Sequence, residues 1–493
     1  MLRMCFPNDD KKQVSTQYAP LCALGQSLVA THFFIPFYAA TNPLQKTVVY
    51  RPMDKILALL LSEMVGCQTL IGVNYTVKPD KALQKAWGLC SCPDQSTISA
   101  TIESFDTETC QTLEFLITQQ FATYSPLRHD KNDEVIIDID LSSIVVCGKQ
   151  LEGAKKGYTP GKKNKRLRKV VRIYSPSTGE IISDWLVPGN FVAENVIKET
   201  IERFEFLMNL STREQRQRFI LRLDSGFGED ACLNRLLARG YHLITKMKSS
   251  RRASKLAKEV PQWDDAPSQN GETKRVFALV GTPKRYCRTT KQVILRFQKG
   301  DGTLSYQVLV TTLCGWDDRT LIQTYDQRVA IESRFSQDKQ GLGLAKRKKK
   351  TMLASEVLLL LGQLAHNLLI WFKDPLIQQG QLLLNFSKKP VESGLPLPQR
   401  NEASVVPETT TSLGSQKPPR DSYRFSRLIQ HLQSYGIVRF IRQIVCISGQ
   451  VSFSGTKVAL IRLNPSHPLT ELVATCLERL LLPIKIPISL GEI

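Results

Sequence analysis

Strand-like and helix-like segments alternate between residues 134 and 248, and this alternation limits the folds that the chain can adopt. Residues 135–146 are dense in Ile and Val, as expected for a buried strand. Residues 169–174 and 180–187 flank a turn sequence and predict a hairpin. A helix is then predicted at 193–210 and a strand at 219–223. A second helix, which ends near 238, and a strand at 241–247 follow. This order predicts a mixed α/β domain.

The rest of the chain has other patterns. Residues 1–130 predict a helical domain, for which DNA binding and dimerisation remain alternatives. The α/β core is expected at 131–249 and, as C-terminal helices, at 318–386, with a β-rich insertion at 250–317 between them. Residues 387–423 are rich in Pro, Ser, Thr and charge and predict a flexible linker. A small basic C-terminal domain is expected at 424–493, with β-like runs at 441–447 and 451–461.

The charge balance indicates a polyanionic partner. The chain has 66 Lys+Arg against 45 Asp+Glu, a net charge of +21, which favours nucleic acid or an anionic membrane surface. The most apolar run, 352–372, holds several polar side chains and therefore predicts a buried core helix, with no membrane partner. Charged residues 9–12 interrupt any signal-peptide layout, so we expect a cytoplasmic protein with reduced cysteines.

Aspartates stand at two positions where α/β sheets commonly bind ligands. Asp224 follows the apolar strand 219–223 and precedes a glycine turn; a helix N-cap is the alternative. Asp138 and Asp140 lie two residues apart in the strand 135–146, so their side chains share one face. Carboxylates in such an apolar strand are costly unless they are solvated, paired or bound to metal.

Residues 325–339 predict a helix that carries a tyrosine, a carboxylate and two cations on one face. At about 100° per residue, four side chains fall within an arc of ~60° over roughly 20 Å, namely Tyr325, Arg328, Glu332 and Lys339. The cations suit phosphates, and the carboxylate can hold a divalent metal beside them. A solvated face with internal ion pairs is the alternative, because Glu and Arg four residues apart support each other in any helix.

This spacing resembles the Y-R-E-K signature of cut-and-paste DDE transposases from bacterial insertion sequences. Two further matches occur in the right order: an Asp-x-Ser at Asp140 and Ser142, and an Arg-x-Asp-Ser-Gly-Phe run that ends at Phe227. The resemblance covers about residues 50–370 and extends more weakly to both ends. Each motif alone is weak, whereas the ordered set of three is specific.

The resemblance implies an RNase H-like catalytic core in which Asp140, Asp224 and Glu332 hold two Mg²⁺ ions, ~4 Å apart in such sites, with Mn²⁺ as a substitute. Asp138 is the alternative first carboxylate, although the hydroxyl residue two positions on, Ser142, favours Asp140. Tyr325, Arg328 and Lys339 would then contact phosphates at the transposon end. The β-rich stretch fits the inserted domain that this group carries.

Three basic clusters fit a path for DNA. The first, at 155–169, supplies these candidate DNA-binding residues: Lys155, Lys156, Lys162, Lys163, Lys165 and Arg166. The others lie at 246–258 and 346–350. Such clusters give sequence-independent affinity that falls steeply with salt.

The expected function is Mg²⁺-dependent DNA cleavage and strand transfer, the cut-and-paste transposition of an insertion sequence. Double-stranded DNA, as transposon ends and target, is the expected partner, bound by a homodimer in the bacterial cytoplasm at the nucleoid. Two alternatives remain: a metal-dependent DNA nuclease without joining activity, and a non-catalytic DNA-binding protein derived from a transposase.

Overall fold

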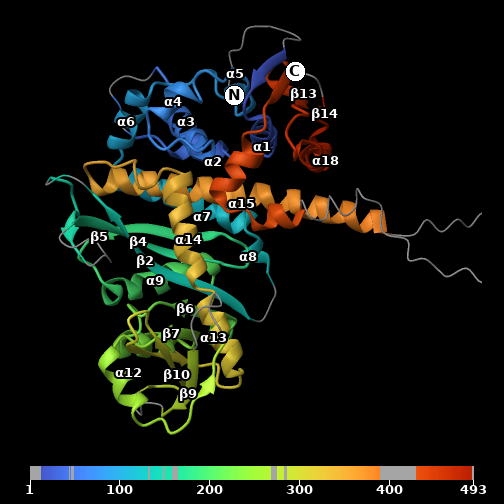
Figure 1. The fold of residues 1–493 in the computed structure, drawn as a ribbon. Helices are drawn as coiled ribbons and strands as arrows, with labels where there is room; N and C mark the ends of the chain where they lie inside the picture. The colour runs from blue at the N-terminus through green and yellow to red at the C-terminus, as the bar shows by residue number, and fades with distance from the viewer. Residues whose placement is uncertain are drawn as a thin grey trace, which may run out of the picture.

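The larger of the two sheets in the described part of the chain has ten strands and lies in the middle and lower part of Figure 1. The computed structural model describes residues 13–43, 45, 49–130, 134–146, 148, 150–157, 165–267, 275–281, 286–388 and 429–490. Along the sheet the strands follow the order β3-β4-β2-β6-β7-β11-β10-β9-β8, and β5 pairs with β4. Their bounds are Val135–Val145 (β2), Lys155–Lys156 (β3), Arg166–Tyr174 (β4), Ile181–Pro188 (β5), Phe219–Leu223 (β6), His242–Lys246 (β7), Asp264–Asp265 (β8), Arg275–Val280 (β9), Lys291–Gln298 (β10) and Leu304–Thr311 (β11). The predicted mixed α/β class is confirmed.

The strands β5, β4, β2, β6 and β7 form the half of the sheet that carries the candidate site. β4 pairs antiparallel with both β2 and β5, whereas β2, β6 and β7 run parallel. Parallel neighbours need crossover connections, which helices α9 (Ala193–Met208) and α11 (Asp230–Arg239) provide. α11 ends at Gly240, whose φ of +96° only glycine adopts at low cost.

The segment 250–317 adds strands to this same sheet. β11 pairs antiparallel with β7, and β10 and β9 continue the meander outward. Helix α12 (Ser250–Ala257) packs on β10 and β11. The predicted β-rich insertion thus joins the core through a strand pair, at the edge that β7 would otherwise expose.

Helix α15 (Met352–Lys388) runs across the molecule between the sheet and the upper helices (Figure 1). Its segment Met352–Gln381 is long and apolar enough to cross a membrane, but 83% of the most apolar window is buried inside the protein. The polar residues of this helix bond to β5: backbone N–H groups of β5 donate to Glu356 (2.8 Å), Gln363 (3.0 Å) and Asn367 (2.9 Å). The expected buried core helix is confirmed, and its polar groups satisfy the edge of the sheet.

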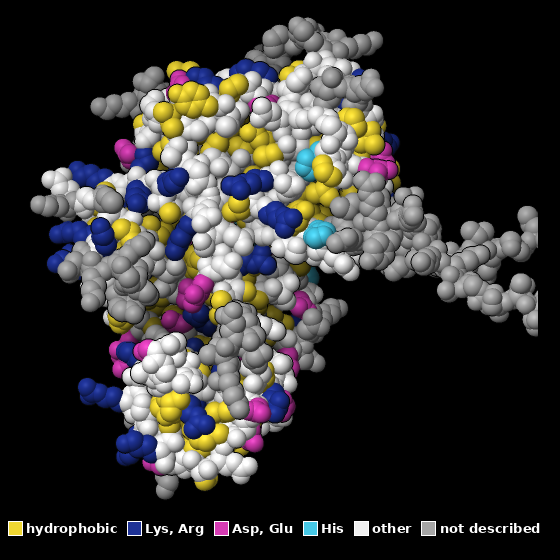
Figure 2. All heavy atoms as spheres, viewed as in Figure 1, with side chains coloured by type: hydrophobic (Ala, Val, Ile, Leu, Met, Phe, Trp, Pro, Cys, Tyr) yellow, Lys and Arg dark blue, Asp and Glu magenta, His cyan; other side chains and the backbone are white. Residues whose placement is uncertain are grey.

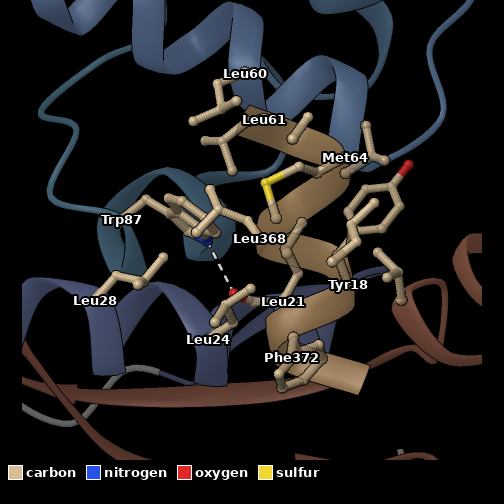
Figure 3. Close-up of a cluster of buried hydrophobic side chains, with 14 of the residues drawn as sticks. Tyr18, Leu21, Leu24, Leu28, Leu60, Leu61, Met64, Trp87, Leu368 and Phe372 are labelled. Carbon is tan, nitrogen blue, oxygen red and sulfur yellow. Dashed lines mark hydrogen bonds between the residues drawn. The ribbon is translucent and has the colours of Figure 1, made fainter. Parts of the chain in front are cut away.

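The upper part of the molecule is one hydrophobic core built from both ends of the chain. The smaller sheet pairs β1 (Gln13–Thr16) with β12 (Gly449–Ser454), followed by β13 (Lys457–Leu463) and β14 (Ile488–Leu490). Figure 3 shows side chains of α1 (Ala19–Ala30), α3 (Pro52–Met64) and α15 packed together around Trp87, whose indole N–H donates to the Leu21 carbonyl at 2.9 Å. Residues of α18 (Thr470–Leu481) belong to the same core.

The other N-terminal helices complete this layer. The region predicted to be helical contains α2 (Ile35–Ala40), α4 (Gly72–Tyr75), α5 (Lys81–Ala86), α6 (Gln95–Glu103), α7 (Thr107–Tyr124) and α8 (Pro126–His129). Segments that the sequence analysis assigned to different domains, 1–130 and 424–493, therefore share a core. Of the predicted linker, residues 389–423 lie outside the described residues.

The predicted strand at 441–447 is wrong. Residues 437–445 form the short helix α17 (Ile437–Phe440) followed by one π-helical turn, Ile441–Val445. The buried positions are 437, 440, 441, 444 and 445, which is the spacing of one helix face. The β-branched residues of this segment therefore led to the wrong prediction. The hairpin in this region is formed by β12 and β13 and turns at Gly455 (φ +57°).

Candidate active site

Asp140 lies within β2, the central strand of the five described above. Its backbone pairs with Arg172 of β4, while the pairing of β2 with β6 ends one residue earlier, at Ile139. Its side chain is only 11% exposed. Burial raises the pKa of Asp140 to about 6; Arg328 opposes this rise, and the nearby Asp224 and Glu332 add to it. The charge on Asp140 therefore depends on a neighbouring cation.

Asp138, the alternative to Asp140, has a different partner. It stands directly opposite Arg222 on β6, and its carboxylate accepts two bonds from that guanidinium, at 2.6 Å and 2.8 Å. Both side chains are buried. A bidentate buried ion pair satisfies the charge of Asp138 within the sheet.

Asp224 is placed by the turn that follows β6. The Gly226 N–H donates to the Asp224 carboxylate at 2.8 Å, and Thr245 on β7 donates to the Asp224 carbonyl at 3.1 Å. A Cβ at Gly228 would lie 1.7 Å from the Lys246 carbonyl oxygen, so this turn requires glycine there to pack on β7. The carboxylate thus sits at the carboxyl end of a buried strand, as the sequence predicted.

Glu332 lies on α14, but not on the continuous helix that the sequence predicted. The segment divides into α13 (Asp318–Asp326) and α14 (Val329–Gly341). The cause is Arg222, whose guanidinium donates to the Thr324 carbonyl at 2.5 Å, the group that the Arg328 N–H would reach in an unbroken helix. The Arg328 N–H bonds to Tyr325 instead, three residues back.

Arg328 stands at this break and brings three carboxylates together. Its Nη2 lies 3.2 Å from Asp140 Oδ1 and 3.9 Å from Asp224 Oδ2, and its Nη1 lies 3.4 Å from Glu332 Oε1. Because Asp140 Oδ1 and Asp224 Oδ2 both lie near Nη2, these two oxygens are at most about 7 Å apart. We call Asp140, Asp224 and Glu332 the acidic trio. Residues 84 and 108 positions apart in the sequence thus converge on a single guanidinium.

The three carboxylates of the trio differ in their exposure to solvent. Exposure of the side chains rises from 11% for Asp140 to 36% for Asp224 and 66% for Glu332. Arg328 is 9% exposed. Burial lowers the pKa of Arg328, but Asp140 and the other neighbouring groups raise it above its usual value. The site is therefore a cationic centre ringed by acids, closed on the side of the sheet and open on the side of α14.

Tyr325 and Lys339 make contacts inside the protein. The buried Tyr325 hydroxyl donates to the Leu223 carbonyl at 3.2 Å. Lys339 donates to Ser142 Oγ at 2.8 Å and to the Ser143 carbonyl at 3.2 Å, and so ties α14 to β2. In this structure both side chains connect α13 and α14 to the sheet.

A cavity of about 410 Å³ adjoins the trio, and its lining includes Lys246, the first residue of the predicted basic cluster at 246–258, and Arg275, which the sequence did not single out. Lys246 extends from the end of β7, with its ammonium 5.2 Å from the centre of the Tyr325 ring, and burial lowers its pKa. Arg275 from the inserted β9 pairs with Asp326 at 2.8 Å. Lys246 stands at the carboxyl end of a strand parallel to β6, and this position could have predicted that it lies beside the trio.

The predicted basic clusters divide into exposed and buried members. Lys155, Lys156, Lys165 and Arg166 are exposed around β3 and the start of β4, while Lys162 and Lys163 lie outside the described residues. Figure 2 shows Lys and Arg side chains along the left edge and across the middle of one face. The cluster at 346–350 is partly structural: Arg347 pairs with the buried Glu63 at 3.2 Å, and Lys349 pairs with Glu103 at 2.8 Å.

The donor chemistry of the trio suits a hard divalent cation, because carboxylate oxygens are the ligands that Mg²⁺ prefers. Within the described part of the chain, however, no three Asp, Glu, His or Cys side chains are close enough together to hold one metal ion. Arg328 explains this spacing, since its guanidinium lies between the oxygens that would meet.

A sequence model of the family described as transposase DDE domain group 1 matches residues 42–383 of this chain. The chain belongs to the DDE transposases. The matched region of this transposase contains the whole acidic trio. No curated protein matches the chain. Among solved structures, a piggyBac transposase synaptic complex with hairpin DNA, determined by cryo-EM, is 13% identical, with a TM-score of 0.43 over 87% of this chain and 84% of that one.

Proposed function

We propose that this transposase cleaves and rejoins DNA in a divalent-metal-dependent, cut-and-paste reaction that moves an insertion sequence, with Asp140, Asp224 and Glu332 as its catalytic carboxylates. The convergence of these residues on Arg328 is the observation that carries the proposal. Three acids gathered at one end of a sheet, beside an excess of basic surface, suit phosphate chemistry and have no role in a purely structural core.

We propose further that β5, β4, β2, β6 and β7, with α9 and α11, form an RNase H-like catalytic core. Support comes from the placement of the carboxylates. One lies on the central strand, one follows the adjacent parallel strand, and one comes from a helix that packs across them. The inserted strands β8–β11 lie between the second and third carboxylates in the sequence.

Magnesium is the proposed metal. Two such ions would activate a water or a DNA 3′ hydroxyl and stabilise the leaving oxygen. The chain contributes placement: β2 holds Asp140 rigidly, the glycine turn holds Asp224, and α14 carries the more exposed Glu332. No residue of the trio needs to form a covalent bond with DNA.

The proposed DNA partner is double-stranded and bound mainly through its phosphates, by a homodimer that holds two ends. The net charge of +21 and the exposed Lys155, Lys156, Lys165 and Arg166 supply sequence-independent attraction. Salt should therefore weaken binding strongly.

Replacing Glu332 with Gln tests the proposal. The change keeps the shape of the side chain and removes the charge that would bind metal. We expect Mg²⁺-dependent cleavage of duplex DNA bearing the sequences that flank the gene to fall by more than the roughly 10–100-fold that loss of an outer-shell partner costs. DNA affinity should stay close to that of the wild type.

Glu259→Gln is the matched control, because Glu259 is an exposed carboxylate just after α12. It should cleave normally. If Glu332→Gln retained full Mg²⁺-dependent cleavage, Glu332 would not belong to the catalytic site. The wild-type products decide between transposase and simple nuclease, since only a transposase joins the released 3′ ends to a second DNA.

A further inference from the structure

Arg328 makes contacts that a residue devoted to DNA phosphates would not make. Each terminal nitrogen of its guanidinium faces the acidic trio, at 3.2 Å and 3.9 Å for Nη2 and 3.4 Å for Nη1. The third nitrogen, Nε, is buried and has no hydrogen-bond partner among the described residues. All the polar contacts that the structure gives to this side chain are therefore with the three carboxylates.

The negative charges of the three carboxylates explain why a cation lies between them. Like charges held within a few ångströms repel one another, and burial adds a desolvation cost for Asp140 in particular. A single guanidinium supplies one positive charge and several N–H donors in a plane, so it can contact three acids at once. Without it, each of the three carboxylates would lose its ion pair with Arg328.

We propose that the Arg328 guanidinium takes the place of the divalent cations between the three carboxylates when no metal is bound, and that it leaves the trio when metal binds. This inference rests on the proposed metal site. Mg²⁺ requires oxygen ligands at about 2.1 Å in a near-octahedral arrangement. The oxygens cannot approach one ion that closely while a guanidinium lies between them. Metal and Arg328 therefore compete for the same carboxylates.

Displacement would also give the guanidinium a new role. The cavity of about 410 Å³ beside the trio is lined by three cations, Lys246, Arg275 and Arg328, and by three carboxylates, Asp224, Asp326 and Glu332. Arg275 pairs with Asp326, and bound metal would neutralise Asp224 and Glu332. Lys246 and the displaced Arg328 would then face an anionic group, and the phosphate of DNA is the anion that the proposed function brings there. Arg328 is in this way a carboxylate partner in the empty protein and a phosphate ligand in the loaded one.

Calorimetric titration of the full chain with Mn²⁺ tests the competition. In Arg328→Gln the competing cation is absent, so we expect Mn²⁺ to bind on the order of tenfold more tightly than to the wild type. Without metal, the same variant should unfold at a lower temperature, because the carboxylates repel. Added Mn²⁺ should then raise its unfolding temperature by more than it raises that of the wild type.

Arg275→Gln is the control, since it removes an equal charge from the same cavity, where Arg275 pairs with Asp326 rather than with the trio. It should change Mn²⁺ affinity much less. Equal or weaker Mn²⁺ binding by Arg328→Gln, with binding by the wild type intact, would overturn this inference and leave the proposed function standing. Failure of both proteins to bind Mn²⁺ would overturn the proposed function as well.

Salt titrations of DNA binding test the exchange of partners. With EDTA present, Arg328→Gln should change the slope of log K against log salt little, because the guanidinium is held by the trio. With Ca²⁺, another cation that prefers oxygen ligands, the variant should lose one phosphate contact and about 0.9 of the slope. A loss of slope that is the same in both buffers would show that Arg328 contacts phosphate all the time, and would overturn the exchange.

Discussion

Asp138 and Asp140 lie two residues apart on one strand, and each pairs with a different arginine. Asp138 pairs with Arg222 across β2 and β6, whereas Asp140 pairs with Arg328. The sequence could predict that both carboxylates share one face. Ser142 favoured Asp140 as the catalytic carboxylate, and Asp140 is the one that contacts Arg328 together with Asp224 and Glu332. It could not identify Arg222 as the partner of Asp138, because that pairing depends on the register between strands 84 residues apart.

Asp138→Asn should therefore act on stability. Removing one charge of a buried pair leaves Arg222 uncompensated, at a cost of about 3 kcal/mol in the free energy of unfolding. Urea denaturation measures this loss, and Mn²⁺ titration at low temperature, where the variant stays folded, should give the affinity of the wild type. If stability were unchanged and Mn²⁺ binding were lost, Asp138 would belong to the metal site instead.

At the scale of elements, α14 is the part that completes the site, and its position depends on several contacts with the sheet. Lys339 bonds to β2, and Asp338 pairs with the buried Arg172 of β4 and with His366 of α15. The periodicity of residues 325–339 predicted one continuous helix, whereas the structure has α13 and α14 there, with Glu332 on α14. The break after α13 could not be predicted, because it arises from a hydrogen bond between Arg222 and Thr324, 102 residues apart.

Lys339→Met should lower cleavage through the position of α14. The substitution keeps most of the side chain's length but removes the bonds to Ser142 and Ser143, so Glu332 is held less accurately. We expect the cleavage rate to fall on the order of tenfold, with the salt slope of DNA binding unchanged. Lys299→Met, at an exposed lysine in the turn between β10 and β11 and outside the predicted basic clusters, is the matched control for loss of charge. A slope lower by about 0.9 in Lys339→Met would mean that Lys339 contacts phosphate, as first expected.

At the scale of the whole molecule, both ends of the chain build one core with α15 between them. β1 pairs with β12, and Gln26 on α1 accepts a hydrogen bond from the Val458 N–H across 432 residues. The strands and helices of the α/β region could be predicted because their signals are local periodicities. The union of residues 1–130 with 424–493 could not, since no local pattern indicates which distant segment will cover an apolar face.

Thermal unfolding followed by calorimetry checks this union. Leu21 on α1 and Leu477 on α18 are fully buried in the shared core, and each change to Ala should cost about 3 kcal/mol. We expect both variants to shift the same transition to lower temperature. A separate early transition in Leu477→Ala alone would show instead that the C-terminal segment unfolds independently.

The way in which β11 joins β7 has a consequence for how such a chain can evolve. Neither side of the five strands that carry Asp140 and Asp224 is left open: the polar groups of α15 bond to β5, and β11 pairs with β7. Strands added beyond β7 alter no register among β2, β4 and β6. The turns between the inserted strands can therefore lengthen or diverge over generations, whereas residues such as Arg275, which lines the cavity beside the trio, are constrained by the site.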